Sequence, residues 1–464
     1  MFKEELDQKI QSAFSTLTID KELVRSLKIR DKRTIPSFVE EWLVARFQKA
    51  GESKANTFKS ISDFMSKHLP DKADKNKIKY AIQNRQPIVL LDRFEVRIDI
   101  ANDKRILTIP SIDENSGTIS KTVLDENHSL LEGGQWGAGR LNLNSDGKNN
   151  IIELVDFQPM ESGTVVLSEV INARKDFSTK EWVQVLLRSM GYEPSAYTER
   201  QQRYLLLRLL PLVQNNINMM ELAPKGTGKS FIYSNLSRYT WLNSGGALSE
   251  AQLFYNLSTK QVGLLGNYDL LVLDEGQSIN FKGADDIHAK FKNYLEAGEF
   301  SRGNKKVPSE CGLMILANIE LFDNKPVRSD YIRHLPEMFH DDALIDRFHG
   351  IIPGWEIPRF TTEMAAHGFG IKADVFGQYL HQLRIVSHVE FPFGESPEIK
   401  GDIRDKNAVT RLCKALSKLL LINPEHEDYR EFVLEPSIEL RNRVREQLAE
   451  LNPSEFSEPL NLQY

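Results

Sequence analysis

The chain of 464 residues contains only two cysteines, Cys311 and Cys413. A disulfide framework or a cysteine-rich zinc site is therefore not expected, and the composition fits a reducing, cytoplasmic setting. No run of residues approaches the ~18 apolar positions that a membrane-spanning helix needs, so no membrane contact is expected. The N-terminal residues are charged and lack the apolar segment of a secretion signal.

The chain also lacks an overall excess of positive charge, since its formal net charge is −6 at pH 7. Net charge therefore gives no reason to expect nucleic-acid binding. Basic residues nevertheless cluster at positions 25–33 and 72–79. Such clusters are usually solvated helix faces, and contact with DNA is the alternative.

The length implies more than one domain. Apolar residues at helical spacing, with a capping box from Ser37 to Glu40, predict an N-terminal helical domain over 1–82. Alternation of apolar and polar residues begins at Phe94 and predicts a small β-rich, OB-like barrel over 83–172. Its expected strands lie near 94–100, 106–109, 141–143, 151–155 and 165–167.

The second half alternates between strand-like and helix-like segments. A capping box from Ser178 to Glu181 opens a helical linker over 173–215. Short apolar runs at 217–222, 270–273 and 313–317 predict strands that are buried on both faces, as in a parallel α/β sheet over 216–370. A helical lid over 371–452 and a polar tail over 453–464 follow.

The strongest chemical signal is the sequence Ala223-Pro-Lys-Gly-Thr-Gly-Lys-Ser230. Its residues Pro224, Lys225, Gly226, Thr227 and Gly228 form a loop whose backbone N–H groups can surround phosphates. Lys229 is expected to reach the β- and γ-phosphates of ATP, and the Ser230 hydroxyl to bind Mg²⁺. Ala223 stands where the first glycine of this motif is usual.

A second element supports a nucleotide site. The apolar run 270–273 ends in Asp274 and Glu275. Asp274 is expected to hold Mg²⁺ and Glu275 to activate the attacking water, whereas the alternative is a strand with an acidic end. Asn318 ends the next apolar run and is expected beside the γ-phosphate, although asparagine at a strand end is often only a turn former.

Two arginines further along the chain fit the same chemistry. Arg347 is a candidate arginine finger, which neutralises charge in the transition state and often comes from a neighbouring subunit. Arg404 is expected to sense the γ-phosphate within its own subunit, and a simple salt bridge is the alternative for it. A GTPase would need Asn-Lys-x-Asp for guanine, but Asn324-Lys-Pro-Val327 has Val327 in place of the aspartate.

The order of these elements resembles AAA+ ATPases, and several segments resemble the Lon-like BrxL family of bacteriophage-exclusion (BREX) systems. The segments that carry this resemblance are 221–230, 253–256, 262–266, 300–303, 133–137 and 404–409. The resemblance implies an MCM-like ring of six copies, or of twelve, that hydrolyses ATP, acts on double-stranded DNA and supports phage defence with other BREX proteins. It implies the roles argued above for Lys229, Ser230, Asp274, Glu275, Asn318, Arg347 and Arg404. Members of this family carry a Lon-type C-terminal domain, but the sequence ends at Tyr464, just after the expected lid, and leaves no room for a Ser-Lys protease dyad. Either the chain is naturally short or a domain has been removed, and proteolysis by this chain is not expected in either case.

The segment 299–308 is expected to form a hairpin that turns at Gly303-Asn304 and carries Arg302, Lys305 and Lys306. In MCM-like rings a hairpin at this place projects into the pore, which would concentrate positive charge on DNA; an ordinary exposed hairpin is the alternative. The sequence therefore favours a DNA-encircling translocase. A polypeptide unfoldase and a nucleotide-switched scaffold that recruits other defence proteins remain alternatives.

Overall fold

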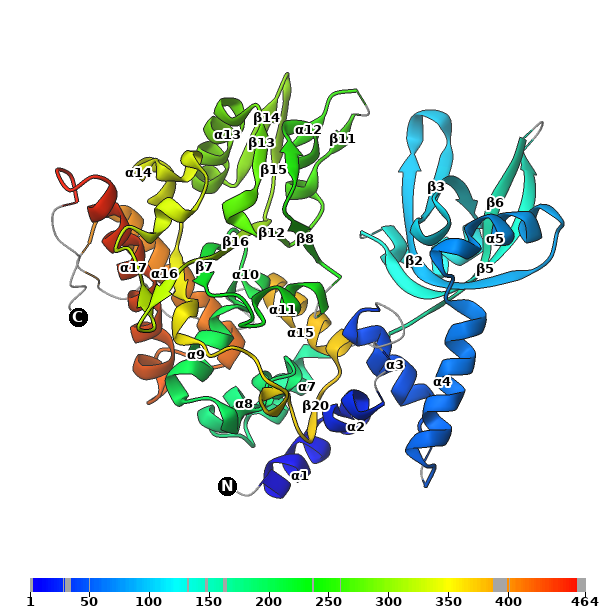
Figure 1. The fold of residues 1–464 in the computed structure, drawn as a ribbon, viewed down its shortest axis with the longest axis horizontal. Coiled ribbons are helices and arrows are strands. Elements are labelled where there is room, and N and C mark those ends of the chain that lie inside the picture. The colour runs from blue at the N-terminus through cyan, green and yellow to red at the C-terminus, as the bar shows by residue number, and fades with distance from the viewer. Residues whose placement is uncertain are drawn as a thin grey trace. The chain divides into compact units, whose positions relative to one another are not determined.

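The computed structural model describes residues 3–27, 29, 35–49, 51–131, 133–146, 149–161, 165–235, 238–258, 260–386, 399 and 401–456. The chain forms two compact units, Glu22–Gly163 and the combination of Met1–Lys21 with Thr164–Tyr464 (Figure 1). The predicted helical segment 1–82 is thus divided between the units, and the other predicted boundaries stay predictions. Part of the basic cluster 25–33 and most of the tail 453–464 lie outside the described residues. In the described ranges, no helix is both long and apolar enough to cross a membrane.

The smaller unit contains a closed barrel of strand order β2-β3-β4-β6-β5. Its strands are β2 (Ile88–Asp99), β3 (Lys104–Ile109), β4 (Glu114–Ile119), β5 (Gln135–Asp146) and β6 (Asn149–Pro159). Its helices are α3 (Ser37–Phe47), α4 (Lys54–His68), α5 (Lys75–Gln83) and α6 (Lys121–Glu126), and α2 (Lys21–Ser26) spans the start of the unit. The barrel closes tightly, because a Cβ on Gly139 would lie 2.4 Å from the buried Phe94 ring. The small barrel that the alternating pattern predicts is therefore present.

Two details of the sequence-based prediction are wrong here. The strand expected at 165–167 is absent, because α7 (Leu167–Arg174) begins there. The first capping box does not form, because Pro36 is the N-cap residue of α3 and Ser37 already lies inside the helix. The capping box of Ser178 with Glu181 is confirmed at the start of α8 (Thr179–Ser189).

The larger unit contains a five-stranded parallel sheet of order β19-β7-β16-β12-β8. The predicted strands are confirmed as β7 (Asn218–Ala223), β12 (Leu270–Asp274) and β16 (Gly312–Asn318). The edge strands β8 (Thr240–Ser244) and β19 (Gly350–Pro353) were not predicted, because one is half-buried with polar residues and the other is very short. Two-stranded ribbons surround the sheet: β1 (Thr18–Asp20) with β20 (Phe369–Ile371), β9 (Ala247–Ser249) with β13 (Asn280–Lys282), β10 (Tyr255–Asn256) with β11 (Gln261–Val262), β14 (Glu299–Arg302) with β15 (Lys305–Pro308), and β17 (Leu321–Phe322) with β18 (Lys325–Pro326).

Helices cover this sheet and continue to the C-terminal region. The helices that precede the sheet strands along the chain, or lie between them in sequence, are α1 (Lys3–Phe14), α9 (Glu199–Leu207), α10 (Leu210–Val213), α11 (Lys229–Asn235), α12 (Glu250–Leu253), α13 (Ala284–Ala297) and α14 (Asp342–Ile345). The predicted helical character of the last region is confirmed by α15 (Ala373–Ile385), α16 (Ile403–Leu420) and α17 (Glu435–Leu451), and α17 packs against β19.

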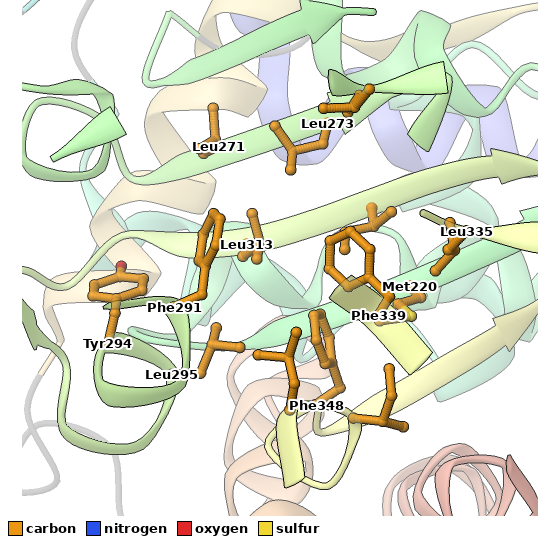
Figure 2. Packing of buried hydrophobic residues seen from close by; sticks show 14 of the residues in the cluster. Met220, Leu271, Leu273, Phe291, Tyr294, Leu295, Leu313, Leu335, Phe339 and Phe348 are labelled. Atoms are coloured by element: carbon orange, nitrogen blue, oxygen red, sulfur yellow. The ribbon is translucent and has the colours of Figure 1, made fainter. Parts of the chain in front are cut away.

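The core of the larger unit lies between the sheet and α13. Figure 2 shows Leu271 and Leu273 of β12 next to Leu313 of β16, with Phe291 and Tyr294 of α13 beside them. These side chains are nearly or fully buried. Burial of this many large apolar groups holds the strands in register and fixes the positions of the residues at their ends.

Candidate nucleotide site

The sheet places the predicted nucleotide-binding residues at one edge. Ala223 at the end of β7 pairs with Asn318 at the end of β16, and the adjacent strand β12 ends at Asp274. Ligands of open parallel sheets bind outside the carboxyl ends of the strands. The topology therefore brings the loop after β7, Asp274 and Asn318 together.

The loop from Ala223 to Ser230 takes a path that requires glycine. Gly226 and Gly228 have φ of +89° and +74°, a region that side chains rarely adopt. A Cβ on Gly228 would also lie 3.2 Å from the Tyr192 hydroxyl. Within the loop Lys225 is exposed, Pro224 and Ser230 are half-buried, and Thr227 is buried.

Lys229 lies at the centre of the site. Its Nζ donates to Asn318 Oδ1 at 2.7 Å and to the Pro224 carbonyl oxygen at 3.5 Å. Burial lowers the pKa of Lys229, while the carboxylates of Glu221, Asp274 and Glu275 act in the opposite direction. The lysine and the asparagine that the sequence predicts around one phosphate are thus in direct contact.

Glu275 is held in an unusual backbone conformation beside Asp274. Its φ is +51°, and its N–H donates to Asp274 Oδ1 at 2.9 Å. The N–H and hydroxyl of Ser278 both donate to its carbonyl oxygen. Strained residues that the surroundings hold in place are frequent at functional sites. Gln277, which the sequence did not indicate, accepts from the Asn318 N–H at 3.0 Å and so fixes the neighbouring strand end.

The donor set fits a magnesium ion that is shared with phosphates. Ser230 offers a hydroxyl and Asp274 a carboxylate, and Mg²⁺ prefers such oxygen ligands with phosphate and water completing its shell. The part of the chain that the structure describes has no group of three or more His, Cys, Asp or Glu side chains that could hold a metal on their own. The ion would therefore depend on the nucleotide for part of its coordination.

A buried ion pair supports the loop 223–230. Arg208 and Glu221 are both fully buried, and Arg208 donates to the two Glu221 oxygens at 2.9 and 2.5 Å. The same guanidinium donates to the Tyr192 hydroxyl at 2.8 Å and to the Thr227 carbonyl oxygen at 3.4 Å. Burial alone would lower the pKa of Arg208, but Glu221 more than offsets this and the pKa is raised. Sequence analysis missed this network; its signal was the single acidic residue inside the apolar strand β7.

The two candidate arginines, Arg347 and Arg404, lie together near the amino ends of the strands. Arg347 precedes β19, whose first residue Gly350 pairs with Met219 near the start of β7. Arg347 Nε lies 2.9 Å from Glu296 Oε2, and Arg404 lies 3.4 Å from the same oxygen. Arg404 also donates to Asp346 at 2.8 Å.

The structure places Arg404 away from the position expected of a sensor within its own subunit, and its role stays a prediction. A sensor within its own subunit would have to lie at the carboxyl ends of the strands, whereas Arg404 lies with Arg347 near their amino ends. Both arginines line a cavity with Glu296 and Asp346, whereas Pro224 and Lys225 line a different cavity with Asn318 and Gln277. Both lie near the amino ends of the strands, whereas the loop 223–230 follows the carboxyl end of β7.

The predicted hairpin is confirmed as β14 and β15, with Arg302 opposite Lys305 and the turn at Gly303-Asn304. Lys305 is exposed at the tip. Lys306 pairs with Glu299 at 2.5 Å but stays 65% exposed. The tip also approaches the β10–β11 ribbon, since a Cβ on Gly303 would lie 3.4 Å from Leu257.

Arg302 is engaged by other residues of the protein, and its predicted DNA contact stays a prediction. Its guanidinium donates to the Tyr255 carbonyl oxygen, and its Nε lies 3.2 Å from Glu250. Only 20% of its side chain is exposed. Arg302 therefore joins the hairpin to its neighbours, and the exposed charge at the tip comes from Lys305 and from Lys306, which is paired with Glu299.

Comparison with known proteins gives matches over nearly the whole chain. A family model described as "Lon-like protease BrxL-like, ATPase domain" matches residues 152–461. A second, "BREX system Lon protease-like protein BrxL N-terminal", matches residues 12–143.

Two full-length relatives are each 30% identical to the chain over 469 aligned positions. The "Lon-like protease BrxL" of Escherichia coli O9:H4 (strain HS) aligns with 97% of this chain, and that of Bacillus cereus (strain H3081.97) with 98%. The chain spans 66% and 68% of the lengths of these relatives.

Proposed function

Since the chain belongs to the BrxL family of BREX systems, as its motifs predicted, we propose that it is a ring-forming AAA+ ATPase that encircles and moves along double-stranded DNA in phage defence. The observation that carries this proposal is the contact of Lys229 with Asn318 at the sheet edge that also holds Asp274 and Glu275. The barrel of the smaller unit is the OB-like module of this architecture, and α15 to α17 form its lid.

Each residue of the site has one chemical task. Lys229 binds the β- and γ-phosphates of ATP, and the loop N–H groups hold the phosphate chain. Ser230 and Asp274 would hold Mg²⁺, which would supply positive charge against the phosphates. Glu275 accepts the proton of the attacking water, and Asn318 orients the γ-phosphate. Arg208, Glu221 and Gln277 keep these groups in position.

A ring explains the position of Arg347. Head-to-tail subunits present one edge of each sheet to the opposite edge of the next, so the finger of one copy meets the nucleotide of its neighbour. Arg404 joins Arg347 in this role instead of acting on its own nucleotide. Six copies fit the proposed MCM-like arrangement, and twelve would correspond to two rings.

The hairpin lysines provide a prediction for DNA binding. Lys305→Ala combined with Lys306→Ala should weaken binding to double-stranded DNA, and the slope of log affinity against log salt should fall by about 2 per subunit, because two phosphate contacts are lost. Salt-dependent fluorescence anisotropy measures both effects. The matched control, Lys175→Ala with Lys325→Ala, removes two exposed charges elsewhere and should bind as the parent does. Equal affinity of the hairpin variant and the control would remove the hairpin from the interface.

The proposal as a whole is tested by steady-state ATP hydrolysis with and without long double-stranded DNA, with Lys229→Ala as the blank. We expect strong stimulation by DNA, since a translocase couples turnover to movement on its track. An ATP hydrolysis rate that DNA does not change but that an unfolded polypeptide increases would favour the unfoldase. A rate that neither polymer changes would favour a scaffold that recruits other BREX proteins.

A further inference from the structure

A cavity of about 380 Å³ lies beside the two lid-side arginines, at the edge of the sheet away from the loop 223–230. We call it the α16 cavity. The charged residues that line it are Glu296, Asp346, Arg347, Arg404, Arg411 and Lys414. Three of the four cations come from one face of α16, because positions 404, 411 and 414 are spaced by two turns and then one turn of helix.

Arg347 and Arg404, which we call the outer arginines, already have acidic partners in the α16 cavity. Arg347 pairs with Glu296 at 2.9 Å, and Arg404 pairs with Asp346 at 2.8 Å. Two arginines therefore face two carboxylates before any ligand arrives. These four residues alone would attract an added anion only weakly, because each cation already has an acidic partner.

The other two cations of the cavity, Arg411 and Lys414, which we call the inner pair, differ because they have no acidic partner within the described residues. The Arg411 guanidinium donates to the carbonyl oxygen of Asn216 at 3.0 Å, and no carboxylate lies within ion-pair distance of Arg411 or Lys414. Burial lowers the pKa of Arg411. His349 on the cavity wall adds no charge, because burial, with Arg411 and Arg441 nearby, lowers its pKa to about 3.

A partly buried cation without a counter-charge is costly unless an anion completes the site. The chain's own nucleotide cannot supply that anion. The β7 residues from Met219, which pairs with Gly350, to Ala223, where the loop begins, alone span about 13 Å of strand. Among the residues that the structure describes, no group of the subunit supplies that anion, whereas a phosphate held by a neighbouring copy would.

We infer that Arg411 and Lys414 bind phosphate oxygens of the ATP held by the loop 223–230 of a neighbouring copy, inward of Arg347 and Arg404. This inference rests on the proposed ring, which it makes more specific. The outer arginines close the entrance and exchange their carboxylate partners for phosphate when the neighbour docks. The inner pair supplies the net positive charge that the balanced outer pair lacks.

Subunit mixing tests this inference. Arg411→Gln with Lys414→Gln keeps the loop 223–230, and Lys229→Ala keeps the α16 cavity. Each variant alone should hydrolyse ATP at least about tenfold more slowly than the parent, as for loss of a charge-stabilising group. An equal mixture should regain up to about a quarter of the parent rate, because one in four random head-to-tail interfaces joins an intact loop to an intact cavity.

A mixture of the Arg347→Ala and Lys229→Ala variants distinguishes failure of this inference from failure of the proposed function. Recovery with Arg347→Ala but not with the inner pair would overturn the inference and leave the ring mechanism standing. Failure of both mixtures would contradict the ring mechanism itself. Parent-rate hydrolysis by the Arg411→Gln, Lys414→Gln variant would also overturn the inference.

Two further measurements guard against misfolding and indirect effects. Binding of a fluorescent ATP analogue to the Arg411→Gln, Lys414→Gln variant should equal that of the parent when the subunits are dilute, and weakened binding there would place the pair on its own nucleotide and overturn the inference. If the double variant does not fold, Lys414→Gln alone, at a half-buried position, should show the same mixing behaviour to a smaller degree. Lys406→Gln, exposed on the same helix and outside the cavity, is the matched control and should hydrolyse as the parent does.

Discussion

Replacing Glu275 with glutamine is expected to lower ATP hydrolysis by about 10²- to 10⁴-fold, the usual contribution of a general base. Glutamine keeps the size of the side chain but cannot accept the proton of the attacking water. The contacts that shape the backbone here, from Ser278 to the Glu275 carbonyl oxygen and from the Glu275 N–H to Asp274, do not involve the substituted carboxylate. ATP should therefore still bind. Single-turnover hydrolysis, measured together with ATP affinity, separates the two effects.

The matched control is Glu320→Gln, an exposed glutamate that follows β16 at the same edge of the sheet. It should hydrolyse ATP at the parent rate, because it removes a similar charge without removing the proposed base. Hydrolysis at the parent rate by Glu275→Gln itself would contradict the assignment of the base. Equal losses in both variants would point to a general electrostatic effect at this edge.

Replacing Arg208 with methionine is expected to lower the free energy of unfolding of the larger unit by about 3–5 kcal/mol. The substitution leaves the fully buried Glu221 carboxylate without its cation, and it also removes a donor to Tyr192 and to the Thr227 carbonyl oxygen. The same change should weaken ATP binding, because Thr227 belongs to the phosphate loop. Urea unfolding followed by tryptophan fluorescence, and ATP titration, measure the two effects.

The double variant Arg208→Met with Glu221→Leu should recover most of the lost stability, because no charge then stays buried alone. Arg203→Met is the matched control; Arg203 lies in α9 and pairs with Glu431 at 3.4 Å on the surface. It should change stability by less than about 1 kcal/mol. If Arg208→Met unfolds at the parent urea concentration, the ion pair is not a support of the loop.

Several features were predictable because their signals are contiguous in sequence. The loop 223–230 contains its own glycines and lysine, and the strand before Asp274 is a plain apolar run. The hairpin turn at Gly303-Asn304 is likewise local, and Gly303 has φ of +58°. Edge strands β8 and β19 escaped prediction because short or half-polar segments are held in the sheet by their neighbours rather than by their own pattern.

The sequence by itself determined the family, the phosphate loop, the acidic strand and the hairpin, because each depends on a few residues that are adjacent along the chain. Only the tertiary structure shows where the arginines lie. Strand order places Arg347 and Arg404 near the amino ends of the strands, away from their own loop. Contacts between distant segments direct Arg302 to Glu250 and pair Arg208 with Glu221. The sequence around an arginine does not show which residues lie next to it in the fold. Those spatial neighbours decide whether its charge is neutralised or free to bind a phosphate.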